Sequence, residues 1–214
     1  MVTLRNTASE FAQYLGRELN FDQKDTETVR YGIEIILGAL IKGVFITFIS
    51  YWIGITPYVL AVLATSSIFR LVSGGVHCST YGRCLVLGTA MMVLTGSLSL
   101  IIGPYVKKDS MLLFVMLTTL TGLYFVKKYA PADNCNKCIT KEEKRAKYRR
   151  LSLFFVVIWA AGITFIILVC RQAPSTYSLV LASIGGFLGQ IFSLCPVGYR
   201  LIGCIDNVLG KILP

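Results

Sequence analysis

The residues best suited to chemistry in this chain lie between Arg70 and Cys84. This stretch contains the only histidine of the protein, His77, and two of its seven cysteines, Cys78 and Cys84. An imidazole that takes the proton of a thiol produces a strong nucleophile, and covalent acyl transfer uses such a pair. The stretch therefore indicates a cysteine nucleophile, Cys84, with His77 as its base.

The spacing of these two residues restricts how the chain can run between them. His77 and Cys84 are seven positions apart, which on one straight helix is two turns, or roughly 10.5 Å of rise. A direct hydrogen bond therefore requires a turn between them, and Tyr81–Gly82 is a suitable place. Gly74–Gly75 would let the backbone fold closely just before His77. Cys78 is the weaker candidate nucleophile, because side chains adjacent in sequence usually point apart.

The order Arg70, Gly74–Gly75, His77 and Cys84 resembles the accessory gene regulator B (AgrB) family of membrane cysteine endopeptidases. In that family the arginine, the second glycine, the histidine and the cysteine recur at these spacings. Chain length and hydropathy are similar too, so the resemblance covers nearly the whole protein. It implies an enzyme of quorum sensing that cleaves a precursor signalling peptide through an acyl-thioester and promotes closure of a thiolactone ring.

The resemblance implies catalytic roles for Cys84 and His77, and a substrate-binding or loop-orienting role for Arg70 and Gly75. From the residues alone, Arg70 could hold a substrate carboxylate, orient the loop or anchor a helix at the membrane edge. Gly75 is better suited to shaping the backbone than to contacting substrate. The residues identify no third catalytic residue and no oxyanion donor. The polar candidates for those roles are Ser73, Ser79 and Thr80.

The composition is that of a membrane protein. Of the 214 residues, 55% are hydrophobic and 15% are charged, and the mean hydropathy is +0.67, whereas a soluble domain carries about 25% charged residues. We predict an all-α polytopic membrane protein, one domain over residues 1–214, with about six transmembrane helices and an interfacial helix at each terminus. The predicted spans are 33–53, 57–71, 85–106, 111–126, 151–170 and 175–196.

Positive charge predicts how these spans are oriented. With both termini in the cytoplasm, the inside segments hold seventeen lysines and arginines and the outside segments hold three. This split places the loop from His77 to Cys84 on the cytoplasmic side of the cell membrane. The same topology, with attraction to anionic lipid, explains the net charge of +10. We therefore expect a lipid bilayer, and no nucleic acid, as a partner.

Two groups of basic residues are candidates for substrate contact. Lys42 lies near the middle of the first span, where it could meet a substrate carboxylate, snorkel to the interface or form an ion pair. The segment 127–150 holds nine lysines and arginines. It could act only as an orientation signal, or it could also dock the acidic tail of a short precursor peptide. The residues proposed for docking are Lys141, Lys144 and Lys147.

An alternative function is a small membrane transporter or a scaffold of a signalling complex. Charges inside the spans would line a transport pathway, but only Glu34 and Lys42 qualify, and no pair of interrupted helices occurs in matching halves. A zinc site is a third alternative. His77, Cys78 and Cys84 are suitable ligands, although the HExxH pattern of zinc hydrolases is absent.

The remaining cysteines give no clear signal. Seven cysteines are an odd number and several lie in apolar runs, which argues against a disulfide framework. Cys135 and Cys138 form a single CxxC, which without a second pair is a weak indication of zinc. Their role stays open, as does the formation of a homodimer. The chemistry expected at Cys84 requires no metal and no cofactor.

Overall fold

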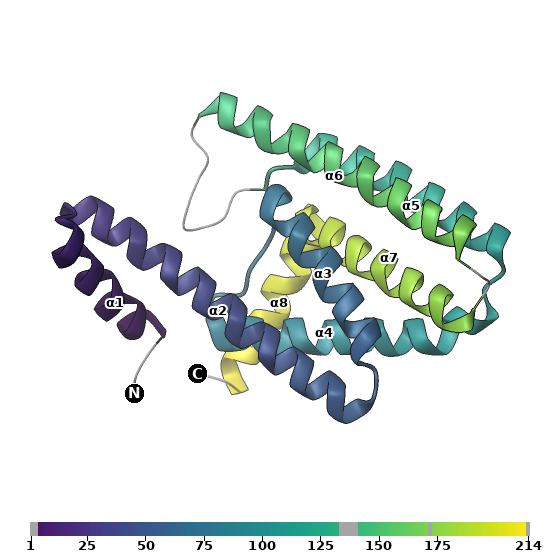
Figure 1. The fold of residues 1–214 in the computed structure, drawn as a ribbon, viewed down its shortest axis with the longest axis horizontal. Helices are drawn as coiled ribbons and strands as arrows, with labels where there is room; N and C mark the ends of the chain where they lie inside the picture. The colour runs from purple at the N-terminus through teal and green to yellow at the C-terminus, as the bar shows by residue number, and fades with distance from the viewer. Residues whose placement is uncertain (1–3, 133–140, 171–172, 213–214) are drawn as a thin grey trace. The chain divides into compact units, whose positions relative to one another are not determined.

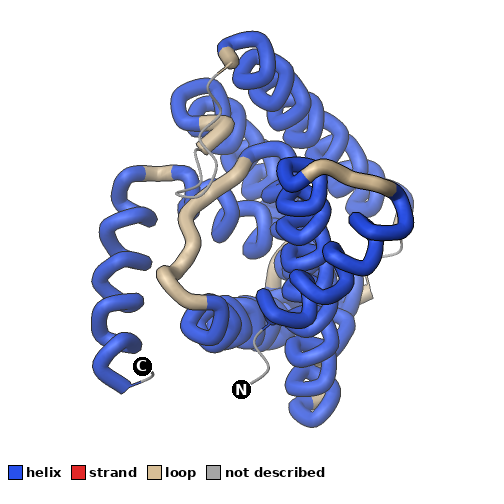
Figure 2. Tube along the Cα trace, turned by 90° about the vertical axis from the view of Figure 1, so that its left-hand side faces the viewer, coloured by secondary structure: helices blue, strands red, loops and turns tan. Residues whose placement is uncertain are grey.

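The computed structural model of the chain describes residues 4–132, 141–170 and 173–212. All regular secondary structure among these residues is helical, so the predicted all-α class is confirmed (Figure 2). The chain divides into two compact units, Met1–Ile49 and Ser50–Pro214. The first holds α1 (Leu4–Leu19) and most of α2 (Gln23–Ile53).

The second unit contains the other six α-helices of the described chain. They are α3 (Thr56–Ser73), α4 (Tyr81–Ile102), α5 (Lys108–Tyr129), α6 (Glu142–Val169), α7 (Pro174–Leu194) and α8 (Pro196–Ile212), with a short 3-10 turn at Gly103–Tyr105. Helices α2 to α7 are long and apolar enough to cross a membrane, which confirms the prediction of about six spans. The terminal helices α1 and α8 are the two shortest α-helices and lie outside this set.

Helix α2 begins well before the predicted residue 33, because the polar sequence ahead of the apolar run is itself helical. Asp22 caps it, and its carboxylate accepts a backbone N–H of the first turn at 2.6 Å. Arg30 then forms ion pairs with Glu27 at 2.8 Å and Glu34 at 2.9 Å, one turn away on either side. Such pairs each stabilise a helix by about 0.2–0.5 kcal/mol.

The charged segment 127–150 is helical at both ends, where the sequence predicts a connecting loop. Helix α5 continues to Tyr129 and α6 begins at Glu142. Long unbranched lysine, arginine and glutamate side chains favour helix, so charge alone does not end one. Arg149 of α6 also donates from Nε to the carbonyl oxygen of Ala130 at 3.0 Å, which satisfies a free acceptor at the end of α5.

Helix α7 is the centre of the second unit. It packs against α3, α4, α5 and α6. In its most apolar stretch 67% of the residues are buried, whereas in the corresponding stretches of those four helices at most 28% are buried. In Figure 1, α5 and α6 lie side by side and α7 lies next to them. Gly186 permits the close contact with α3, since a Cβ there would lie 2.6 Å from the carbonyl oxygen of Val62.

A stack of four aromatic rings joins α3, α6 and α7 in the core. Phe69 stacks on Phe155 and on Phe187, with centroids 4.9 and 5.1 Å apart, and Trp159 stacks on Phe187 at 4.2 Å. The indole N–H of Trp159 donates to the hydroxyl oxygen of Ser183 at 3.0 Å. Phe69 directly precedes Arg70 on α3, so these contacts fix the end of the helix that leads into the His77 loop.

Candidate active site

The loop that carries His77 leaves α3 through two glycines in conformations that other residues rarely adopt. Gly74 has a φ of +70° and Gly75 a φ of +140°, and only glycine takes such values readily. A Cβ on Gly75 would also lie 2.5 Å from the hydroxyl oxygen of Ser193 on α7. Both the backbone conformation and the contact with α7 therefore favour glycine at position 75, while a role in loop orientation or substrate binding stays a prediction.

Gln190 of α7 holds this glycine turn in place. Its Nε2 donates to the carbonyl oxygen of Gly74 at 2.6 Å and to the hydroxyl oxygen of Ser73 at 3.0 Å. The side chain is 3% exposed, so these bonds are made in a low-dielectric environment where each is strong. Gln190 is not among the site residues predicted from the sequence. An amide within an apolar span was the signal that could have identified it.

Arg70 is engaged with the same loop. Its Nη2 donates to the carbonyl oxygen of Val76, and its Nη1 to Oε1 of Gln190 at 3.5 Å. Of the roles that the sequence leaves open for Arg70, orienting the loop is the one these contacts support.

The turn between His77 and Cys84 ends earlier than the sequence suggests. Thr80 is the N-cap of α4, and its hydroxyl oxygen accepts the backbone N–H of Arg83 at 3.5 Å. Residues Tyr81–Gly82 are therefore helical, and the turn predicted there is wrong. Threonine is a good N-cap because its side-chain oxygen satisfies a free N–H of the first turn. Cys84 consequently lies in the first turns of α4, four residues after the cap.

The chain brings the two predicted catalytic side chains together. The Sγ atom of Cys84 lies 3.9 Å from Nδ1 of His77. Helical side chains lean toward the N-terminus of their helix, so Cys84 is directed back toward the loop. The N-terminal end of a helix also favours negative charge. This arrangement can transfer a proton from the thiol to the imidazole once the distance shortens, as contacts in unliganded sites often do.

A carboxylate from α8 joins the site, and the sequence analysis did not identify it. Asp206 accepts the backbone N–H of Ser79 through Oδ2 at 3.0 Å, and its Oδ1 lies 3.9 Å from Nη1 of Arg83. Hydrogen bonds from Ser79, together with the charge of Arg83, hold the pKa of Asp206 below its usual value. A single acid among the apolar residues of α8 was the available signal.

The three polar residues considered for further roles are used in building the loop. Ser73 accepts from Gln190. The hydroxyl oxygen of Ser79 accepts from Nη1 of Arg83 at 3.0 Å, and Thr80 caps α4. These contacts support structural roles, and none of them identifies an oxyanion donor.

The other predicted site residues lie outside this group of contacts. Lys42 belongs to the first unit, and its role stays a prediction. Lys141, Lys144 and Lys147 are exposed at the beginning of α6, so they are free to meet a partner, but their docking role also stays a prediction. Cys135 and Cys138 lie outside the described residues.

Geometry gives the zinc alternative no support. No three His, Cys, Asp or Glu side chains are grouped as metal ligands in the part of the chain that the structure describes. His77, Cys78 and Cys84 are therefore close in sequence without forming such a group.

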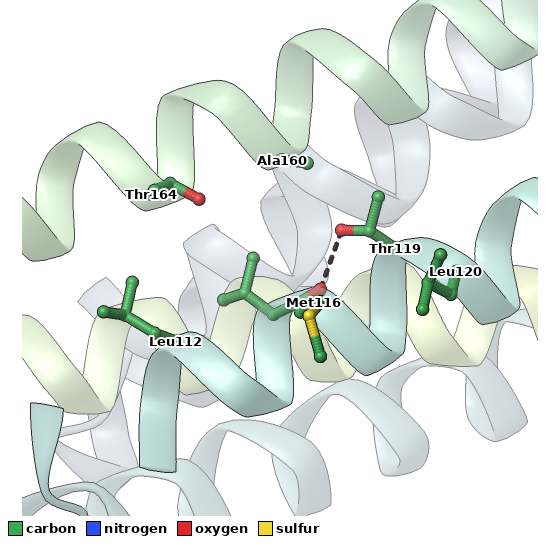
Figure 3. Close-up of a pocket in the computed structure, with 7 residues that line it drawn as sticks. Leu112, Met116, Thr119, Leu120, Ala160 and Thr164 are labelled. Carbon is green, nitrogen blue, oxygen red and sulfur yellow. Dashed lines mark hydrogen bonds between the residues drawn. The ribbon is translucent and has the colours of Figure 1, made fainter. Parts of the chain in front are cut away.

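An apolar hollow of about 340 Å³ lies between α5 and α6 (Figure 3). Its lining consists of Leu112, Val115, Met116, Thr119, Leu120, Ala160 and Thr164. The hydroxyl of Thr119 donates to the carbonyl of Val115 on its own helix at 2.7 Å. The lining has no ionisable side chain, so we assign this hollow no part in the chemistry.

Comparison with known proteins establishes the family. The family model described as Accessory gene regulator B matches residues 8–194. The chain belongs to the AgrB family. Putative AgrB-like protein 2 of Clostridium perfringens (strain 13 / Type A) is 28% identical over 215 residues, which cover 98% of this chain and 100% of the relative. The AgrB resemblance inferred from the residues around His77 is therefore confirmed.

A second AgrB relative is similar over a shorter region. Accessory gene regulator protein B of Staphylococcus aureus (strain bovine RF122 / ET3-1) is 26% identical over 156 residues, which cover 72% of this chain and 79% of the relative. No solved structure matches the chain. The AgrB family match ends at residue 194, so α8 and its Asp206 lie beyond it.

Proposed function

We propose that this AgrB-family protein is a membrane cysteine endopeptidase that cleaves a precursor signalling peptide and promotes closure of a thiolactone ring. The observation that carries the proposal is the 3.9 Å separation between Sγ of Cys84 and Nδ1 of His77, in a chain of the AgrB family. A thiol and an imidazole held together at the end of a membrane span are the groups that cysteine-dependent acyl transfer requires.

In the first step, His77 accepts the thiol proton through Nδ1 and the Cys84 sulfur attacks a peptide carbonyl of the precursor. A nearby positive charge stabilises a thiolate, and Arg70, which is bonded to the same loop, would supply such a charge. The tetrahedral intermediate then expels the amine of the departing segment. His77 returns its proton to that amine, which leaves the remaining peptide joined to Cys84 as an acyl-thioester.

In the second step, a cysteine of the bound peptide attacks the thioester carbonyl. A new thioester forms within the peptide, which closes the thiolactone ring, and the Cys84 sulfur leaves. His77 takes the proton of the peptide thiol and returns it to the Cys84 sulfur. Converting an amide to a thioester is uphill, so water must be excluded until the ring closes. Departure of the cleaved tail also favours the forward reaction.

We place the reaction at the cytoplasmic edge of the cell membrane. Positive charge predicts that orientation, and the site lies where α3 ends and α4 begins. The exposed lysines Lys141, Lys144 and Lys147 would receive an acidic tail of the precursor. Arg70 is bonded to the loop, so we assign the tail to these lysines and not to Arg70.

Reaction with iodoacetamide tests the proposed function without knowledge of the substrate. In membranes at pH 7, Cys84 should be alkylated faster than the other described cysteines, and His77→Ala should remove that advantage. Cys78 is the matched internal control, because it is adjacent to His77 and as half-buried as Cys84. Equal rates at Cys84 and Cys78 would contradict the proposal. A transporter, a scaffold or a zinc site predicts no selective reaction at Cys84.

A further inference from the structure

We infer that Asp206 of α8 is a positioning residue for the Cys84–His77 pair, and that the C-terminal helix is therefore part of the working site. The inference rests on the proposed function, because it gives Asp206 a role in that reaction. It goes beyond the residues that the family match includes, since the match ends before α8.

The carboxylate of Asp206 binds the middle of the connection between the two catalytic residues. It accepts the backbone N–H of Ser79 at 3.0 Å, and Ser79 lies two residues after His77. The Asp206 side chain is 12% exposed, so the carboxylate is held among protein atoms and is not a solvated surface acid. Moving Asp206 away would leave the Ser79 N–H without this partner and free the loop to shift.

The same carboxylate reaches the helix that carries Cys84. Arg83, which directly precedes Cys84, places Nη1 3.9 Å from Oδ1 of Asp206 and 3.0 Å from the hydroxyl oxygen of Ser79. Its guanidinium lies against Gly210, where an added Cβ would be 3.1 Å from the guanidinium carbon. Asp206 and Gly210 are one helical turn apart on α8. One face of this helix therefore contacts both Ser79 in the loop and Arg83 at the start of α4.

The direction of α8 is fixed before it reaches the loop. Gly198 packs against the carbonyl oxygen of Phe192 at the corner between α7 and α8, with no room for a side chain. The end of α7 also binds the loop, because the carbonyl of Ser193 accepts the N–H of Val76 at 3.1 Å. Contacts from α7 and α8 therefore hold the chain on both sides of His77, which fixes the imidazole relative to the thiol.

Replacement of Asp206 should slow the chemical step more than it weakens binding. A misplacement of about 1 Å at a reacting centre can cost about 10²-fold in rate. We expect Asp206→Ala to lower kcat by about 10- to 100-fold with KM changed less than threefold. Asp206→Asn keeps an oxygen that can accept from Ser79 and should lose less. Asn207→Ala is the matched control, since Asn207 is the exposed neighbour on the same helix.

The experiment uses the full-length protein in lipid nanodiscs and three measurements. Hydrogen–deuterium exchange over residues 76–84 reports whether the loop is held. Alkylation of Cys84 by iodoacetamide is measured at pH 7 and at pH 9.5. At pH 7 the rate depends on proton transfer from the thiol to His77, whereas at pH 9.5 an ordinary thiol is already ionised. Only the rate at pH 7 therefore reports how Cys84 and His77 are aligned. Cleavage of a tagged short precursor peptide with a central cysteine and an acidic tail gives kcat and KM, with Cys84→Ala as the blank.

The expected result for Asp206→Ala has three parts. Exchange over 76–84 becomes faster, Cys84 alkylation slows several-fold at pH 7 but not at pH 9.5, and kcat falls. Unchanged exchange overturns the assigned contact. Faster exchange with parental kcat and alkylation overturns the positioning role while leaving the proposed function intact. Cleavage by Cys84→Ala at the parental rate would instead refute the proposed function, and the role of Asp206 with it.

Discussion

Gly74 and Ala132 form a parallel β-bridge, although α4 and α5 lie between them in the chain. The backbone N–H of Ala132 also donates to the carbonyl of Ser73 at 2.9 Å. The end of α3 and the end of α5 therefore meet at one end of the helix bundle. This is the geometry that six alternating spans require, and it places the His77 loop on the same side as the charged segment that follows α5.

Reporter fusions should show that this shared side is the cytoplasm. A reporter fused after Arg150 or after Pro214 should read cytoplasmic, and one in the Lys107–Asp109 turn should read external, because positively charged segments are retained inside. The measurement is the ratio of a cytoplasm-active to an exterior-active reporter at each site. A cytoplasmic signal from the Lys107–Asp109 turn would overturn the orientation.

Substitutions of the proposed catalytic pair should lower the rate of cleavage to different extents. Cys84→Ala removes the nucleophile, so cleavage should vanish, and Cys84→Ser should lose nearly all activity because His77 deprotonates a hydroxyl far less readily. His77→Ala removes the base and proton donor, a loss of at least about 10²-fold. Membranes containing each variant and a tagged precursor would be assayed by gel, with expression checked.

Cys78→Ala is the control for that series and should stay active, since the proposed mechanism gives Cys78 no role. Cleavage by Cys84→Ala together with loss in Cys78→Ala would mean that the nucleophile is misassigned. Parental activity in both variants would make the loop structural, and the peptidase proposal would fail.

Gln190→Ala should destabilise the protein, because it removes the amide that donates to the buried hydroxyl oxygen of Ser73 and to the half-buried carbonyl of Gly74. Leaving a buried polar group unsatisfied costs about 1–3 kcal/mol. Thermal unfolding in nanodiscs should show a lower midpoint than in the parent. Gly189→Ala is the matched control, because that neighbour has open space around its Cα. An equal effect in both variants would show that the hydrogen bonds of Gln190 contribute little.

Changing Lys141, Lys144 and Lys147 together to Gln should weaken binding of an acidic precursor tail several-fold. All three are exposed, so added salt should weaken binding to the parent in the same way. Binding of a fluorescent tail peptide to nanodiscs at low and high salt provides the measurement. A triple variant that inserts normally and binds as tightly as the parent would leave these residues only an orienting role.

The contribution of Asp206 should not vary with pH in the working range. Its pKa lies below the ordinary value because Ser79 and Arg83 favour the carboxylate. Its stabilising contribution is therefore complete above the ordinary pKa of about 3.9 and is lost only as the pH falls through the lowered value. The activity ratio of parent to Asp206→Asn should stay constant from pH 5.5 to pH 8. A ratio that falls toward one at pH 5.5 would show a carboxylate that titrates higher.

Much of the architecture was predictable from local sequence. Apolar runs of 15 to 22 residues identify the six spans, and a histidine seven residues before a cysteine identifies the candidate pair. Helix limits were less predictable, because the charged starts of α2 and α6 are stabilised by caps and side-chain pairs and not by apolar periodicity. The turn placed at Tyr81–Gly82 failed for a similar reason, since the capping hydroxyl of Thr80 outweighs the glycine.

Gln190 and Asp206 stand out as polar residues in apolar helices, but their roles could not be assigned from sequence, because each acts on a loop more than a hundred residues away in the chain. Each also bonds a backbone group of that loop, and such a contact leaves no pattern of residue types. Only the packing of α7 and α8 reveals that an amide and a carboxylate hold the segment that carries His77.

Helix α8 also presents hydrocarbon on its outer side. Leu201, Val208 and Ile212 are 51%, 53% and 70% exposed, as expected for a helix that lies in the bilayer surface. The helix that contacts the His77 turn is therefore suited to lie in one lipid leaflet. Under the proposed function, a change in the thickness or tension of that leaflet would shift α8 and with it the alignment of Cys84 and His77, and extraction into detergent would remove this effect. Peptide processing would then depend on the physical condition of the membrane as well as on the supply of precursor.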